Sequence, residues 1–275
     1  MKKLIILFGI FCLMTSFTPK KELTWVAIGD SITYLNDHLD ETGNRITQGY
    51  MTRVVEKLPC IHFTNQGHNG WTAVRIAGSI EKLGLIKADI YTVFLGTNDW
   101  WGGLSIGNIS DYRDSTGNKT VYGAYRTIIN KIRSLNSEAK IILITPMQRG
   151  DFVYVKNAKN NAYGSYKDKN GSHLSEFADA VKNIAQLENF KLIDLYYKSG
   201  ITSANAVKYK RLKDPKTGEY KNYTYPDYTT ITFNAVTDEY PYPLDALDMT
   251  YDGLHPSNKG MAVIAKMLVK VMKKF

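Results

Sequence analysis

Cysteine is scarce in this chain, with only Cys12 and Cys60 among 275 residues. Two cysteines are too few for a disulfide framework or for a cysteine-rich zinc site. Long apolar runs are also scarce, and the one that stands out lies within the first 17 residues. With 44% hydrophobic and 22% charged residues, the chain belongs to neither the fibrous nor the disordered class. A globular chain of this length can bury a sizeable core.

The charge is unbalanced, because 35 Lys and Arg residues face 26 Asp and Glu residues, a formal net charge of +9. Such an excess alone suggests an anionic partner, such as nucleic acid, a membrane surface or an acidic polymer. Loss of Lys2 and Lys3 with a leader would lower the net charge to about +7. Much of the remainder lies in residues 198–221 and in the last predicted helix, so we predict no nucleic-acid partner.

The start of the chain has the pattern of a secretory leader. Met1, Lys2 and Lys3 precede an uncharged apolar run over residues 4–14. A run of this length is too short to span a bilayer and is typical of a signal peptide. We therefore predict a signal peptide over residues 1–17, a secreted or periplasmic protein, and no stable membrane insertion. The alternatives are a buried strand and a lipoprotein attached through Cys12.

Short apolar runs alternate with helix-like stretches along the rest of the chain. The runs predict buried strands at residues 23–28, 61–63, 89–95, 140–145 and 190–195. Apolar residues at helical spacing predict helices at residues 47–58, 120–135 and 174–187, and a last helix that begins near Ser257. This alternation predicts a single α/β domain over residues 22–275, with a parallel sheet covered on both faces. In such sheets the ligand site lies outside the carboxyl ends of the strands.

Two segments interrupt the alternation. Residues 149–171 are polar and rich in Asn, Lys and Gly, which predicts a loop. Residues 196–251 hold ten of the 19 tyrosines together with many lysines, and we interpret them as an insertion in the domain. Within the insertion, residues 207–225 could form a β-hairpin around a turn at residues 215–218. Loops of this length are uncommon in compact domains and are often functional.

Residues with catalytic potential follow the predicted strands or precede the last helix. Ser31 follows the first strand, and a serine hydroxyl needs a neighbouring base to act as a nucleophile. Asp252 lies three residues before His255, where it can orient the imidazole through Nδ1 and leave Nε2 free to take a proton. The Gly67 amide and the Asn98 side chain are suitable donors to a developing oxyanion. Taken singly, each could also be an ordinary turn, cap or surface residue.

Four short blocks occur in a fixed order along the chain. They are GDSIT at residues 29–33, NQGHNGWT at 65–72, GTND at 96–99 and DGLHP at 252–256. In sequence, order and separation these blocks resemble those of the SGNH (GDSL-type) hydrolase family. The resemblance covers the chain from about residue 24 to its C-terminus, apart from the two interrupting segments.

The resemblance implies a three-layer α/β/α sandwich around a five-stranded parallel sheet, similar to flavodoxin. It implies a carboxylic ester hydrolase in which Ser31 is the nucleophile, His255 is the general base and then the acid, and Asp252 orients His255. The oxyanion hole would consist of the backbone amides of Ser31 and Gly67 and the side chain of Asn98. Neither a metal ion nor an organic cofactor is required by this acyl-enzyme route.

The sequence says less about the substrate. Trp100 and Trp101 could stack on a sugar, line an acyl pocket or pack against the insertion. Asp30 and His68 are further candidates for contact with substrate. The Tyr-rich and Lys-rich insertion suits a hydrated polymer, so we predict a small-molecule or polysaccharide ester, with acetyl groups on carbohydrate favoured. The alternatives are a lysophospholipase, thioesterase or arylesterase, and a non-catalytic glycan-binding module.

Overall fold

A five-stranded sheet forms the centre of the protein, in a computed structural model that describes residues 21–164 and 166–275. The strand order is β2-β1-β3-β4-β7, and each neighbouring pair is parallel. The strands are β1 (Leu23–Gly29), β2 (Ile61–Gly67), β3 (Ile90–Phe94), β4 (Lys140–Ile144) and β7 (Lys191–Ile193). Every residue of β3 is buried, as a strand covered on both faces requires. All five predicted strands are therefore confirmed, and the predicted leader lies outside the described residues.

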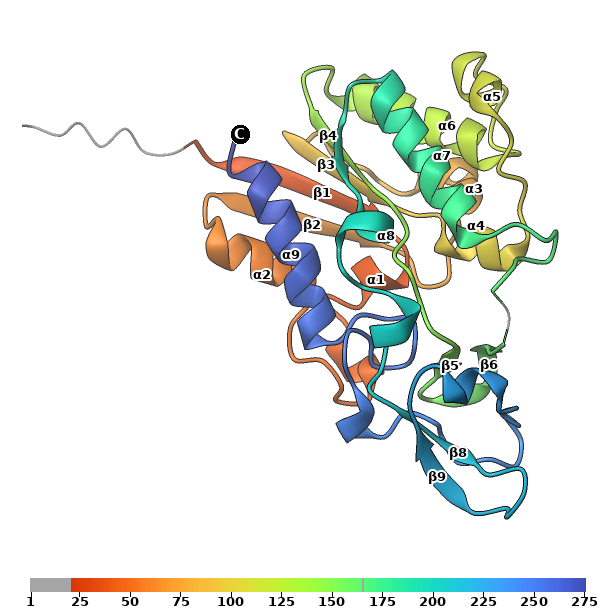
Figure 1. Ribbon diagram of the computed structural model, residues 1–275. Helices are drawn as coiled ribbons and strands as arrows, with labels where there is room; N and C mark the ends of the chain where they lie inside the picture. Colours follow the sequence, from red (N-terminus) through yellow and green to blue (C-terminus); the bar gives the residue numbers. More distant parts are fainter. Residues whose placement is uncertain (1–20, 165) are drawn as a thin grey trace, which may run out of the picture.

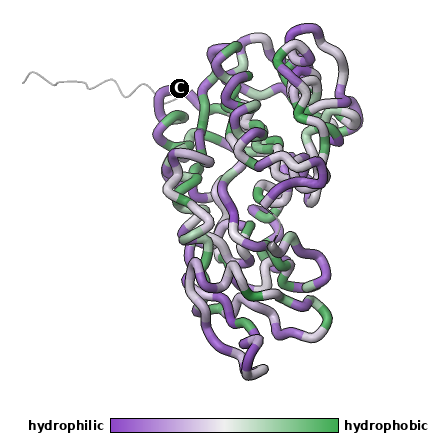
Figure 2. Tube along the Cα trace, turned by 45° about the vertical axis from the view of Figure 1, so that its right-hand side comes forward, coloured by the Kyte–Doolittle hydropathy of each residue, from purple (hydrophilic) through white to green (hydrophobic). Residues whose placement is uncertain are grey.

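Helices cover both faces of this sheet, which makes the three-layer sandwich (Figure 1). One apolar cluster joins the sheet to α2 (Tyr50–Lys57) and α9 (Asn258–Met272). A second cluster joins its other face to α3 (Ala73–Gly78), α6 (Val121–Leu135) and α7 (Leu174–Leu187). Hydrophobic and hydrophilic residues alternate along these helices (Figure 2), as one-sided burial requires.

Several short helices escape the sequence prediction because they span one or two turns, too few for a periodic apolar pattern. They are α1 (Ser31–Tyr34), α4 (Thr97–Gly102), α5 (Ile109–Arg113) and α8 (Leu195–Lys198). Single 3₁₀ turns lie at Leu39–Thr42, Ile80–Lys82, Ser203–Asn205, Asp227–Thr230 and Leu244–Ala246. Two of the short helices matter for the site, because α1 begins at Ser31 and α4 contains Asn98.

The two interrupting segments contain secondary structure of their own. Residues 149–171 hold an antiparallel pair, β5 (Phe152–Tyr154) and β6 (Asn157–Ala162), which corrects the prediction of a loop. Three-residue strands are too short to give an alternating pattern, although Phe-Val-Tyr is an apolar run within a polar stretch. The hairpin predicted in the second segment is confirmed as β8 (Lys210–Lys213) and β9 (Tyr220–Tyr223).

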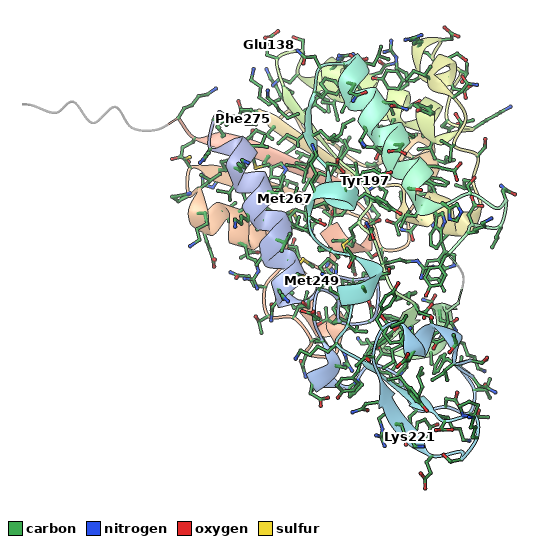
Figure 3. All side chains as sticks on the ribbon, viewed as in Figure 1. Glu138, Tyr197, Lys221, Met249, Met267 and Phe275 are labelled. Carbon is green, nitrogen blue, oxygen red and sulfur yellow. The ribbon has the colours of Figure 1, made fainter. Side chains whose placement is uncertain are left out.

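These two segments pack on each other, and together we call them the insertion lobe (residues 149–171 and 196–251). Their shared apolar cluster consists of Val153, Val207, Leu212, Tyr228, Ile231, Phe233 and Tyr242. The lobe lies beyond the carboxyl ends of the sheet strands (Figure 1). Lys221 marks its tip, at the opposite end of the molecule from Glu138 (Figure 3). The fold therefore places the lobe beside the edge where parallel sheets bind ligands.

Candidate active site

The strand register brings the predicted site residues to one edge of the sheet. Gly29 at the end of β1 pairs with Gly67 on β2 and with Phe94 on β3, so the three strands end together. Ser31 and Asn98 follow directly in the helices that begin after β1 and β3. Asp252 and His255, which shortly precede α9 in the sequence, lie at the same edge, where His255 contacts Ser31.

Ser31, His255 and Asp252 form a continuous hydrogen-bonded chain. His255 Nε2 lies 2.8 Å from Ser31 Oγ, and His255 Nδ1 lies 2.7 Å from Asp252 Oδ2. The second carboxylate oxygen, Oδ1, accepts the amides of Leu254 and His255 at 3.0 and 2.7 Å. A carboxylate at Nδ1 favours the tautomer whose Nε2 is an acceptor, so the Ser31 proton can pass to the imidazole. The three residues are 8%, 6% and 0% exposed, which limits competition from water.

The electrostatic setting of His255 suits proton transfer. Burial lowers the pKa of His255, but the Asp252 carboxylate outweighs this effect and raises the pKa above 6.5. The neutral imidazole that can accept a proton therefore predominates only at a pH above this raised pKa. A carboxylate in this position also stabilises an imidazolium if the ring takes up a second proton.

Aromatic rings hold the imidazole on two sides. The Tyr251 ring stacks near His255, with centroids 5.7 Å apart and planes 17° apart. Phe152 contacts His255 edge to face at 5.4 Å, and Trp101 contacts Phe152 in the same manner at 5.1 Å. Phe152 comes from β5, so the insertion lobe supplies part of the wall of the site. The sequence prediction missed Phe152 because it treated residues 149–171 as a polar loop.

The structure corrects the prediction that Gly67 supplies an oxyanion donor. The Gly67 amide already donates a hydrogen bond to Asn65 Oδ1 at 2.8 Å. A Cβ atom at Gly67 would lie 2.1 Å from the Tyr34 backbone nitrogen. Gly67 therefore allows β2 to approach the backbone at Tyr34, and its N–H is engaged elsewhere.

Gly70, the second glycine of the NQGHNGWT block, has the properties that Gly67 lacks. Its φ of +73° places it in the left-handed region, and a Cβ atom there would meet nothing within 4 Å. Within the described residues no atom accepts a hydrogen bond from its amide. Asn98 Nδ2 donates to Trp71 O at 3.0 Å, which ties the Asn98 side chain to the residue after Gly70. An amide nitrogen carries two hydrogens, so a second donor remains on Asn98.

The Asp99 side chain holds α4 and the segment after Gly70 together. The carboxylate accepts the amides of Ala73 at 2.8 Å and Val74 at 3.3 Å, at the start of α3. Burial raises the pKa of Asp99 to about 6. Asp99 thus joins α4, which carries Asn98, to the segment that follows Gly70.

Two of the predicted substrate contacts are buried. Trp100 is 2% exposed, its indole N–H donates to Ser172 O at 3.2 Å, and the Arg149 guanidinium lies 4.5 Å from its ring. Trp100 is therefore packed inside the fold, where it also lines a pocket of about 160 Å³ together with Arg149 and Tyr166. Asp30 is also buried and caps α1 by accepting the Ile32 amide at 3.0 Å, and burial raises its pKa to about 6. The capping role of Asp30 corrects its prediction of substrate contact, whereas contact by Trp100 stays a prediction.

The other two candidates are partly accessible. His68 is half-buried and stacks on Trp71 with ring centroids 4.4 Å apart. Burial and the neighbouring Arg75 lower the pKa of His68, which keeps its ring neutral at pH 7. Trp101 is half-buried beside Phe152. Substrate contact by His68 and Trp101 stays a prediction.

Other kinds of site find no support in the described part of the chain. Across residues 21–164 and 166–275, no group of three or more His, Cys, Asp or Glu side chains is placed to hold a metal ion. No helix within these residues is both long and apolar enough to cross a membrane. Cys60 is buried as a free thiol, and Cys12 lies outside the described residues.

The protein combines a three-layer α/β/α fold with a hydrogen-bonded chain of Ser31, His255 and Asp252 at the carboxyl edge of its parallel sheet. The chain belongs to the GDSL-like lipase/acylhydrolase family, whose family model matches residues 27–263. This finding confirms the family resemblance of the four blocks and the prediction of a carboxylic ester hydrolase.

Solved structures agree with this assignment. A possible lipase from Chitinophaga pinensis is 61% identical, with a TM-score of 0.90, and the match covers 92% of this chain and 98% of that one. A Lactobacillus plantarum protein is 18% identical with a TM-score of 0.62, covering 92% and 98%. A lipase/acylhydrolase from Enterococcus faecalis is 19% identical with a TM-score of 0.51, covering 91% and 95%, and these two show the fold alone. A search of curated proteins gave no match.

Proposed function

We propose that this protein is a secreted serine esterase that removes short acyl groups, acetyl above all, from carbohydrate. The observation that carries the proposal is the hydrogen-bonded chain from Ser31 Oγ through His255 to Asp252. It supplies a nucleophile, a base within reach of its proton, and a carboxylate that orients the base.

In the proposed cycle, Ser31 Oγ attacks the ester carbonyl carbon while its proton moves to His255 Nε2. The tetrahedral intermediate collapses, the bond to the alcohol oxygen breaks, and His255 returns the proton to the leaving alcohol. Water then attacks the acyl-Ser31 ester, with His255 again as the base. Collapse of the second intermediate releases the carboxylic acid and restores Ser31.

We assign the oxyanion hole to the backbone amides of Ser31 and Gly70 and to Asn98 Nδ2. Neither the Ser31 backbone amide nor the Gly70 backbone amide donates a hydrogen bond to an atom of the described residues. Donors held in place before the reaction cost no reorganisation when charge develops on the carbonyl oxygen.

Replacing the side-chain donor tests this assignment. Asn98→Ala is expected to lower kcat for p-nitrophenyl acetate about 10²–10³-fold, because one oxyanion donor is lost. KM should change little, since the oxyanion forms only in the transition state. Asn118→Ala is the matched control, because Asn118 also donates from its side chain to a backbone oxygen, Val74 O. A rise in KM with unchanged kcat would assign Asn98 to substrate binding instead.

The shape of the site supports a short acyl group. Phe152 closes one side of His255, and Ser31 is nearly buried. Two large cavities of about 450 and 600 Å³ lie along α9, lined in part by Ala265, Lys266 and Val263, and Ser31 lines neither of them. The half-buried Trp101 and Tyr154 next to Phe152 offer flat rings on which a sugar can stack.

Acyl-chain length provides the test of this substrate class. From p-nitrophenyl acetate to the octanoate we expect kcat/KM to fall about 10–100-fold, because Phe152 closes one side of the site and leaves less room for the longer chain. Acetate release from a panel of acetylated glycans, with heat-treated enzyme as blank, should then identify the carbohydrate that forms the alcohol part of the ester. A preference for octanoyl or palmitoyl esters would instead support a lysophospholipase or thioesterase.

The proposal of secretion rests on the sequence of residues 1–17, with its basic start and apolar run. In the minority alternative the protein is a lipoprotein attached through Cys12. Mass spectrometry of the mature protein distinguishes an unmodified new N-terminus from an acylated cysteine.

A further inference from the structure

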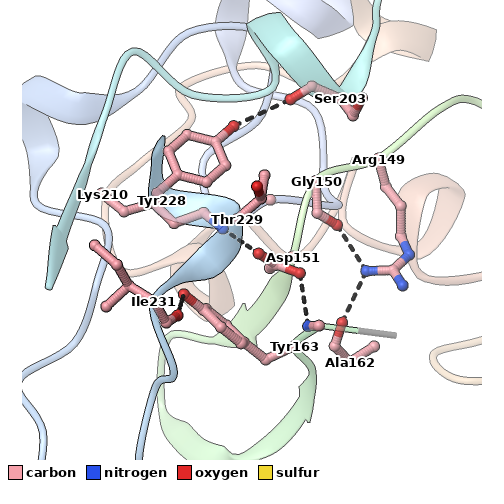
Figure 4. Close-up of polar contacts among 12 residues, drawn as sticks. Arg149, Gly150, Asp151, Ala162, Tyr163, Ser203, Lys210, Tyr228, Thr229 and Ile231 are labelled. Carbon is pink, nitrogen blue, oxygen red and sulfur yellow. Dashed lines mark hydrogen bonds and ion pairs between the residues drawn. The ribbon is translucent and has the colours of Figure 1, made fainter. Parts of the chain in front are cut away.

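The insertion lobe has a charged pair at its centre. Lys210 Nζ donates a hydrogen bond to Asp151 Oδ2, and each of the two residues is 1% exposed (Figure 4). The other carboxylate oxygen of Asp151 accepts the Gly164 amide at 2.7 Å. Lys210 is the cation bound directly to Asp151, and the buried Arg149 guanidinium is a second positive charge that acts on this carboxylate. Removing Lys210 therefore takes away the direct partner of a buried carboxylate.

Three tyrosines surround the Lys210 ammonium group. Its Nζ lies 3.9 Å from the ring centroid of Tyr228, 4.7 Å from that of Tyr163 and 6.0 Å from that of Tyr242. Such rings attract a cation through their electron-rich faces. Burial lowers the pKa of Lys210 to about 8, although Asp151 opposes this effect. Tyr163 belongs to the first segment of the lobe and Tyr228 to the second. The tyrosines around Lys210 therefore join the two segments.

The Lys210–Asp151 pair is connected to the active site through hydrogen bonds between backbone groups. The Gly150 amide donates to Gly253 O at 2.7 Å, and the Val153 amide donates to Asp252 O at 3.1 Å. Between these two bonds lies Asp151, whose carbonyl accepts the Tyr242 hydroxyl.

Two further contacts tighten this connection. Gly253 has a φ of +89°, and a Cβ atom there would lie 1.7 Å from Asp151 O, so the two backbones touch. Phe152, the next residue, places its ring against His255. The turn that carries Asp252 and His255 is therefore fastened to residues 150–153, which include Asp151 and the start of β5.

We propose that Lys210, Asp151 and Tyr242 are positioning residues that hold the Asp252–His255 turn in register with Ser31. The inference rests on the proposed function. Without the Lys210 ammonium group, the buried Asp151 carboxylate loses its direct partner and is expected to move towards Arg149 or towards water. Movement of Asp151 pulls on both backbone hydrogen bonds to the turn. A displacement of about 1 Å at a catalytic group can cost about 100-fold in rate.

Lys210→Met tests the inference in the full-length protein. With p-nitrophenyl acetate we expect kcat to fall about 10–100-fold with little change in KM. The acid limb of the pH profile of kcat/KM should also move to lower pH. The reason for this movement is that Asp252 would contact His255 less closely and would raise the pKa of His255 less. Lys210→Arg keeps the charge and should restore part of kcat.

Lys213→Met is the matched control, because Lys213 lies on the same strand but is exposed. Tyr242→Phe is the second variant, which keeps the ring and removes only the hydroxyl that binds Asp151 O. If thermal melting shows that Lys210→Met is unfolded at the assay temperature, Tyr242→Phe decides by the same two readouts. A folded variant with wild-type kcat and an unmoved acid limb would overturn the inference. Failure of the proposed function would show differently, as wild-type protein without turnover that depends on Ser31.

Discussion

Ser31→Ala is expected to lower kcat for p-nitrophenyl acetate on the order of 10⁶-fold, as loss of the nucleophile does in other serine hydrolases. The reason is structural: Ser31 Oγ is the atom in contact with His255 Nε2, and alanine offers no atom to acylate. Steady-state rates above the non-enzymatic background give the measurement, and a fluorophosphonate probe should label the wild type but not the variant.

Ser137→Ala is the control, because Ser137 is exposed at the turn before β4, at the other end of the sheet. It should hydrolyse the ester and take up the probe as the wild type does. Equal rates in wild type and Ser31→Ala would disprove the triad. If the wild type and the variant both stayed at the non-enzymatic background, the result would favour the alternative of a non-catalytic glycan-binding module.

Asp252→Asn is expected to lower kcat about 10⁴-fold, the size of effect known for the equivalent change in a Ser-His-Asp triad. The asparagine Oδ1 can still accept the Leu254 and His255 amides, so the turn should keep its shape. Its NH₂ group would face His255 Nδ1, which then becomes the acceptor. The remaining ring proton moves to Nε2, where it faces Ser31 Oγ and prevents uptake of the serine proton.

Asp227→Asn is the matched control for this charge change, because Asp227 is exposed at the start of a 3₁₀ turn in the insertion lobe. Its kcat and melting temperature should equal those of the wild type. Asp252→Asn should melt close to the wild type while losing activity. A loss smaller than about tenfold would show that Asp252 has little part in orienting His255.

The fold was accessible from sequence because its signals are local. Five apolar runs matched five strands, and the α7 boundaries predicted from periodicity, residues 174–187, are those observed. Ser257 caps α9 as predicted, accepting the amides of Lys259 and Gly260. Strand and helix periods depend on neighbours within a few residues, so they can be recognised without knowledge of the packing.

The sequence by itself also determined which side chains meet in the site, although Ser31 and His255 are 224 residues apart. Parallel strands end at the same edge of a sheet, so residues that follow several strand ends must converge. The first three blocks reinforced this argument, because each places a polar or flexible residue at such an end. The fourth block precedes α9, and the family resemblance linked it to the other three.

Tertiary structure alone decided which donors are available and what encloses the site. The Gly67 amide donates its hydrogen bond to Asn65, whereas the Gly70 amide has no acceptor among the described residues, which is why we propose Gly70 as the oxyanion donor. Phe152 reaches His255 only because β5 lies along the Asp252–Gly253 backbone, and Lys210 meets Asp151 across 59 residues of sequence. No periodic pattern in the sequence indicates either the contact between Phe152 and His255 or that between Lys210 and Asp151. Each depends on how two irregular segments pack against one another, which is set by burial and hydrogen bonding in the folded chain.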